Sequence, residues 1–144
     1  MKILLLILLS LSLIAQSEFT IIGNQNEQSH KFLKIDVIKD KRIKRDTVNN
    51  SECYYKNGVI TDKSCYIQTG NILVTFGKKT KVDYISYALK HNLKYVKIVN
   101  PLYNTVLYEV RDKDIEIIEI VNKLNKTDKT YRSRVEWIKP RYLR

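Results

Sequence analysis

Residues 71–100 read NILVTFGKKTKVDYISYALKHNLKYVKIVN and predict two strands separated by a helix. Strand-forming Ile, Leu, Val and Phe fill residues 72–76, and Gly77 ends that strand. A second strand covers residues 95–99, since Pro101, just beyond it, cannot continue a sheet ladder. This strand–helix–strand unit sets the pattern for the rest of the fold.

The segment between the two strands predicts an amphipathic helix over residues 80–92. Thr80 is the expected N-cap, because its hydroxyl suits the free amides of a first helical turn and Asp83 follows three residues later. The apolar residues expected to pack on the sheet recur at helical spacing: Val82, Ile85 and Leu89.

The residues that follow extend the pattern to β-α-β-β-α-β. We expect a strand over 105–110, a helix that begins at Asp112 or Asp114, and a last strand over 131–138. The isoleucine content of the second helix also suits a strand. Its expected inner face is Ile117, Ile118, Val121 and Leu124. The predicted fold class is α+β: a ferredoxin-like βαββαβ arrangement, with two helices on one face of an antiparallel four-stranded sheet.

Alternation along the strands predicts which side chains face the helices and which lie on the helix-free side, here called the open face. The helix-facing set is Ile72, Val74, Phe76, Val96, Ile98, Val106, Tyr108, Val135 and Trp137. The open-face set is Leu73, Thr75, Tyr95, Lys97, Val99, Leu107, Glu109, Glu136 and Ile138. The second set is too apolar for a face that meets only water, and exposed apolar patches are typical of partner sites. The alternative is that residues 51–70 or the N-terminal segment covers this face.

Residues 1–17 are typical of a secretory signal peptide. Lys2 is followed by an almost unbroken Leu/Ile run to Ile14, and Ala15 and Ser17 offer small residues around a cleavage point. The run is shorter than the roughly 20 residues that a membrane-spanning helix needs. We therefore expect a secreted or periplasmic protein that meets the membrane only transiently, through this segment. An uncleaved anchor is the alternative.

Three further parts follow the signal segment. Residues 18–50 are polar and basic and predict a leader or linker. Residues 51–70 predict a β-hairpin, because Asn57-Gly58 suits a two-residue type I′ turn and residues 69–71 suit a second turn. Residues 71–144 hold the βαββαβ domain.

Cys53 and Cys65 flank the predicted hairpin. An even number of cysteines in an exported chain favours a disulfide, which would clamp the ends of the hairpin. A zinc site is the weaker alternative, since neither His30 nor His91 lies near this pair in the sequence.

The sequence contains no pattern typical of a catalytic site. It has two histidines, four glycines and no Gly-rich phosphate loop, nucleophile elbow or zinc-protease helix. We expect a non-enzyme without cofactor or metal. The formal net charge of +11 favours acidic partners. Export argues against nucleic acid, and residues 105–110 lack the signature of an RNA-recognition strand.

Four segments follow one another in a distinctive order. They are the apolar strand 71–76 ending in Phe, an asparagine turn into a strand at 91–96, the strand 107–110, and the Val-Glu-Trp and Pro-Arg-Tyr elements within 135–142. In this order and spacing they resemble the propeptide domain of subtilisin-like serine proteases. The tyrosine-rich segment 54–58 is similar to a hairpin that precedes the propeptide in some large members of that family.

The resemblance implies a domain that assists folding of a protease and inhibits the mature enzyme. In that mode the open face packs on the protease and the C-terminal tail enters its active-site cleft. The expected protease-binding residues are Leu73, Tyr95, Val99, Leu107, Glu109, Glu136, Ile138, Arg141, Tyr142, Leu143 and Arg144. Because no protease domain follows Arg144, we expect a stand-alone inhibitor or folding helper whose partner is a subtilisin-like serine protease. The alternatives are an exported binding or envelope module with another partner, a remnant of a truncated protease gene and, more remotely, a nucleic-acid-binding protein.

We predict that the exported protein begins near Ser17 or Glu18 and carries an oxidised cysteine pair. Intact mass spectrometry, before and after alkylation of free thiols, measures both properties. An exported protein that retains residues 1–14 would contradict the predicted cleavage, and uptake of two alkyl groups without a reductant would contradict the predicted disulfide.

Overall fold

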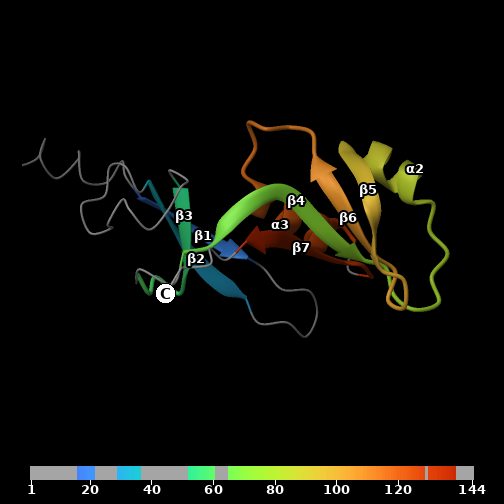
Figure 1. The fold of residues 1–144 in the computed structure, drawn as a ribbon, viewed down its shortest axis with the longest axis horizontal. Helices are drawn as coiled ribbons and strands as arrows, with labels where there is room; N and C mark the ends of the chain where they lie inside the picture. The colour runs from blue at the N-terminus through green and yellow to red at the C-terminus, as the bar shows by residue number, and fades with distance from the viewer. Residues whose placement is uncertain (1–15, 22–28, 37–51, 61–64, 129, 139–144) are drawn as a thin grey trace, which may run out of the picture. The chain divides into compact units, whose positions relative to one another are not determined.

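A computed structural model describes residues 16–21, 29–36, 52–60, 65–128 and 130–138. They form an α+β protein with two antiparallel sheets, one of three strands in the order β1-β2-β3 and one of four strands in the order β5-β6-β4-β7 (Figure 1). The elements are β1 (Gln16–Ile21), β2 (His30–Asp36), β3 (Glu52–Lys56), β4 (Ile67–Thr75), α2 (Tyr84–Lys90), β5 (Leu93–Asn100), β6 (Thr105–Val110), α3 (Ile117–Thr127) and β7 (Arg132–Ile138). The chain divides into two compact units, one built on the three-stranded sheet and the other chiefly from Gln68–Trp137.

The first unit is held by the predicted disulfide. Cys53 and Cys65 are joined with their Cα atoms 5.2 Å apart, which confirms the predicted pairing. The two cysteines and Tyr55 form a small buried cluster, against which Leu33 of β2 packs. A disulfide supplies the cross-link that a sheet of this size needs, because its apolar core is too small to be stable alone.

The strands of the first unit differ from the expected hairpin. Asn57 and Gly58 do adopt the positive φ angles, 55° and 69°, that a type I′ turn requires. Beyond the turn, Tyr66 exchanges two backbone hydrogen bonds of 2.9 Å with Tyr54 as an isolated bridge. The main ladder of β3 is instead with β2, where Leu33 lies opposite Tyr55.

Residues 18–50 contain strands that the polar composition of this segment concealed. They include most of β1 and all of β2, where the sequence predicted only a leader or linker. The apolar side chain of Phe32 is buried, 5% exposed, in a stretch that mixes apolar and charged residues. A strand that is buried on only one face of a short sheet needs few apolar residues. For this reason, the composition of the segment did not reveal β2.

Strand β4 forms the centre of the second unit. Ile72 pairs with Tyr108 and Val74 with Val106 across the β4–β6 ladder, and all four side chains are fully buried. The predicted turn at residues 69–71 is wrong, because β4 runs through this segment without a break. Gly70 adopts φ +90° inside the strand, so the residue that suggested a turn lets the strand deviate locally instead.

Helix α2 begins later and turns another face to the sheet than the sequence predicted. Asp83, not Thr80, is the N-cap, and its carboxylate accepts hydrogen bonds of 3.1 Å from the amides of Ile85 and Ser86. These bonds lower the pKa of Asp83, since they favour the ionised form. The buried helical residues are Tyr87 and Ala88, whereas Ile85 and Leu89 are 54% and 67% exposed. The expected inner face was therefore wrong.

Helix α3 presents the predicted apolar face to the sheet. Its buried side chains include Ile117, Ile118, Val121 and Leu124, as expected from their spacing. Glu116 occupies the N-cap, so neither Asp112 nor Asp114 caps the helix. Its carboxylate makes no capping bond to the helix amides and instead accepts a hydrogen bond of 2.7 Å from Gln68 Nε2. The side chain of Asn125 joins α3 to β7 by bonding both backbone groups of Ser133, at 2.8 and 3.1 Å.

An aromatic cluster fills the space between the four-stranded sheet and α2. Phe76 lies at its centre, with ring centroids 4.7 Å from Tyr131, 4.9 Å from Tyr87 and 6.4 Å from Tyr108. Burial raises the pKa of Tyr87 to about 12 and raises that of Tyr108 as well, because a phenolate is poorly solvated there. Tyr87, one of the two buried residues of α2, therefore packs within this cluster.

Strand β5 departs from the predicted alternation. Register shifts interrupt its ladder with β6 between Tyr95 and Lys97 and again between Ile98 and Asn100. Val96 and Ile98, expected to face the helices and be buried, are 43% and 41% exposed. Ile98 still lies opposite Val106, on the predicted side of the sheet, so its exposure reflects the edge position of β5. Val96 lies within the first register shift, which simple alternation cannot anticipate. On β7, Val135 is buried as expected and Trp137 is half-buried.

We predict that Phe76→Ala lowers the free energy of unfolding by about 3–5 kcal/mol, because it leaves a cavity inside the aromatic cluster. Urea denaturation of the second unit, followed through the fluorescence of Trp137, measures this loss. The matched control is Leu102→Ala, at a side chain that is 63% exposed. Equal unfolding midpoints for the two variants would contradict the central role of Phe76.

Candidate functional site

The open face consists of the sheet side chains that point away from the helices. The β4–β6 ladder places Leu73 opposite Leu107 and Asn71 opposite Glu109, so these four side chains share one face. Hydrogen bonds from Thr69 and Asn71 to Glu136 place the latter on the same face. The open face therefore draws side chains from each of the central strands and from β7.

The apolar centre of the open face is narrow. Leu107 is buried, with 6% exposure, and its cross-strand neighbour Leu73 is half-buried. Ile138, the last residue of β7, is 52% exposed. Of the expected apolar contact residues on this face, Ile138 is the most accessible to a partner.

Glu136 lies in a polar network that fixes its carboxylate. Its Oε2 atom accepts hydrogen bonds from Thr69 Oγ1 at 2.5 Å and from Asn71 Nδ2 at 2.9 Å. Thr69 Oγ1 in turn accepts a bond from the Asn71 amide at 3.2 Å. A carboxylate held by two neighbouring side chains loses little conformational entropy when a partner binds it, which suits a contact residue.

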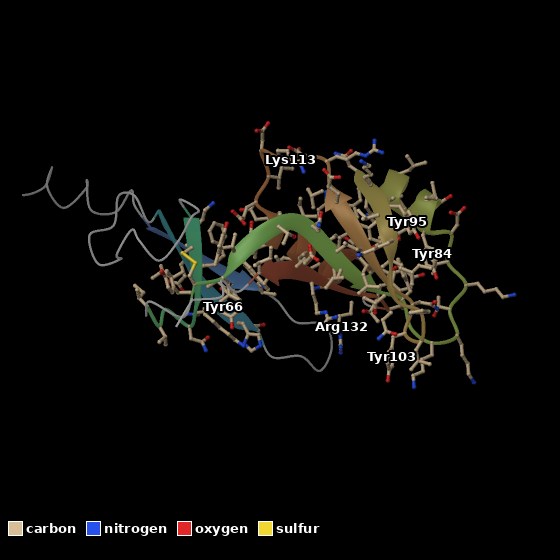
Figure 2. All side chains as sticks on the ribbon, viewed as in Figure 1. Tyr66, Tyr84, Tyr95, Tyr103, Lys113 and Arg132 are labelled. Carbon is tan, nitrogen blue, oxygen red and sulfur yellow. A yellow bond between two sulfur atoms is a disulfide. The ribbon has the colours of Figure 1, made fainter. Side chains whose placement is uncertain are left out.

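Glu109 forms a second, more solvent-exposed ionic cluster. Its carboxylate oxygens lie 3.3 Å from Lys113 Nζ and 3.7 Å from Lys94 Nζ. The hydrogen bond and charge of Lys113, followed by the charge of Lys94, lower the pKa of Glu109. Figure 2 shows Lys113 on the loop that follows β6. Glu109 is thus already paired, and its charge is partly balanced by the protein.

The two expected site residues on β5 lie in different environments. Tyr95 is directly opposite Tyr108 and its ring stacks on Tyr84 of α2, with centroids 6.2 Å apart (Figure 2). It therefore lies on the helix side, and its assignment to the open face was wrong. The bulges of β5 explain the error, because they displace the alternation by one residue. Val99 is 50% exposed, within the second irregular stretch.

The remaining predicted contacts, Arg141, Tyr142, Leu143 and Arg144, lie outside the described residues. Sequence reasoning also missed Thr69 and Asn71, which position Glu136. A turn had been predicted at these residues. If the period-2 pattern had been extended backward from Leu73, it would have placed both on the open face.

Among the residues that the structure describes, no group of histidine, cysteine or acidic side chains is arranged to hold a metal ion. In the same ranges, no helix is both long and apolar enough to cross a membrane. The open face, as described above, is a surface of fixed polar groups around a small apolar centre.

Comparison with known proteins adds no relative to this description. The chain matches no protein-family model, no curated protein and no solved structure. The described residues define an α+β protein with two helices and two antiparallel sheets.

We predict that Leu107→Glu destabilises the second unit by about 3 kcal/mol or more, since a carboxylate would replace a buried side chain without a partner. Thr75→Glu is the comparison on the same face, where the side chain is half-buried. Urea denaturation of both variants gives the difference between their free energies of unfolding. Wild-type stability of Leu107→Glu would show that this side chain is accessible after all.

Proposed function

We propose that residues 68–138 adopt the ferredoxin-like βαββαβ arrangement. The strand order β5-β6-β4-β7 supports it, because the first and third strands of the unit, β4 and β6, lie at the centre. Helix α2 connects β4 to β5 and α3 connects β6 to β7. Both helices contribute buried residues on the side of Val74 and Val135, which leaves the opposite face without a helix.

On this fold, we propose that the protein binds a subtilisin-like serine protease and inhibits it or assists its folding. The observation that carries the proposal is the position of β7 at the edge of the four-stranded sheet, with the open face beside it. Residues 139–144 follow this edge strand directly. An edge strand that continues into a basic, aromatic segment suits protease recognition, in which an extended peptide pairs with the edge of the cleft.

The chemistry of the open face agrees with a partner that associates reversibly. Interfaces of this kind have an apolar centre and a polar rim. Here Leu73 and Ile138 provide apolar contact area, and Glu136 and Glu109 provide oriented charge. The order of the sequence segments that resemble subtilase propeptides supports the same class of partner.

The test measures inhibition of several subtilisin-like proteases by the exported protein and by two variants. Ile138→Glu places a charge at the exposed end of β7, and removal of residues 141–144 shortens the tail. Both should weaken inhibition without loss of fold. Ile85→Glu is the matched control, because Ile85 is 54% exposed and lies on α2, away from the open face.

A folding role is separated from inhibition by refolding a denatured subtilisin-like protease with and without the protein. Recovery of activity that depends on Ile138 would favour the folding helper. If wild type neither inhibits nor assists any of these proteases at micromolar concentration, the proposed partner is wrong. If Ile138→Glu and Ile85→Glu weaken inhibition equally, the proposed surface is wrong.

A further inference from the structure

A cleft of about 540 Å³ opens on the helix side of the second unit, between the C-terminal end of α2 and helix α3. This volume lies within the range of small-molecule sites. Its apolar lining is Leu93, Val110, Ile115, Ile120 and Leu124. Ile115 is 45% exposed and Ile120 is half-buried, so part of the apolar wall remains in contact with water.

Five charged or titratable side chains line the cleft: Lys90, His91, Lys123, Asp112 and Glu119. The charges of Lys90 and Lys123 both act on His91, so these three lie near one another. Within the described part of the chain, neither Lys90 nor Lys123 forms an ion pair. Asp112 already accepts a hydrogen bond of 3.0 Å from the Asp114 amide. The cleft therefore offers two cations without an ion pair and apolar surface in the same lining.

We propose that this cleft binds a small amphipathic anion, a carboxylate with an unbranched apolar body. Its head would lie near Lys90, His91 and Lys123, and its body along Ile120 and Ile115. Positions 119 and 127, the two ends of the α3 segment that lines the cleft, are about 12 Å apart, and Lys123 lies midway between them. Asp112 and Glu119 also line the cleft and favour an uncharged tail over a second carboxylate, since like charges repel.

Histidine protonation should strengthen the binding. Burial, and then the charge of Lys90, lower the pKa of His91, with a smaller contribution from Lys123, while Asp128 acts in the opposite sense. The other charged groups that line the cleft are Asp112 and Glu119. His91 is therefore largely neutral at neutral pH and becomes a further cation as the pH falls. A bound carboxylate would favour that charged form.

The experiment is a titration of the full exported protein with octanoate, followed by NMR shifts of its backbone amides. Octylammonium and octan-1-ol carry the same apolar body with a cationic and a neutral head. We expect saturable shifts with octanoate, confined to residues that line the cleft, and weaker binding of the other two probes. Affinity should rise as the pH falls below about 6.5, the ordinary histidine pKa, because the pKa of His91 is lower than that value, and His91→Asn should remove this rise.

Two variants and their controls locate the site. Lys123→Gln should weaken octanoate binding roughly two- to fivefold, whereas Lys126→Gln, at an exposed lysine of α3 outside the cleft, should not. Ile115→Asp should weaken it further, with Leu102→Asp as the exposed apolar control. Absence of saturable shifts at millimolar octanoate, equal binding of octylammonium, or equal effects of Lys123→Gln and Lys126→Gln would each overturn the proposal. Protease inhibition uses the opposite face, so its failure would leave this result unaffected.

Discussion

The aromatic cluster around Phe76 is the contact on which the second unit depends. It joins rings from α2, β5 and β6 with those of the residues just after β4 and just before β7, namely Phe76, Tyr84, Tyr87, Tyr95, Tyr108 and Tyr131. Aromatic side chains bury large apolar areas, and tyrosine also requires partners for its hydroxyl. Tyr108 donates to the Tyr84 carbonyl at 3.2 Å and Tyr84 donates to Asn104 Oδ1 at 3.1 Å. Asn104 in turn donates to the carbonyls of Gly77 and Thr80, so the cluster also fixes the loop that leads into α2.

The sequence was most informative where one face of an element was strictly apolar. The core positions of β4, β6 and α3 followed from the spacing of apolar residues along each element. Ile72, Val74, Val106 and Val121 lie at such positions, and all four side chains are buried. Helix α2 was harder, since its buried face is tyrosine and alanine while its exposed face carries isoleucine and leucine. Because α2 carries apolar residues on both sides, the sequence does not show which side packs on the sheet. In the structure Tyr87 packs on Phe76, so the tyrosine side is the buried one.

Other features depend on backbone geometry and on distant partners. Gly70 reads equally as a turn or as a glycine within a strand, and only the folded chain, in which β4 runs from Ile67 to Thr75, decides between them. The bulges of β5 moved Tyr95 to the helix side. On the open face, Glu136 was correctly placed by alternation, but its partners come from 65 and 67 positions earlier in the chain. Contacts between residues so far apart in the chain depend on the fold, and the sequence around Glu136 gives no indication of them.

The irregular pairing of β5 has a consequence for solubility. This strand is at one edge of the four-stranded sheet and exposes Val96, Ile98 and Val99. A straight apolar edge of eight residues would offer a template for another chain to extend the sheet. Two register shifts interrupt the repeat of free backbone groups, and Lys97 adds a charge that repels the same strand of a second copy. The bulges that defeat simple alternation therefore also protect the protein against edge-to-edge aggregation.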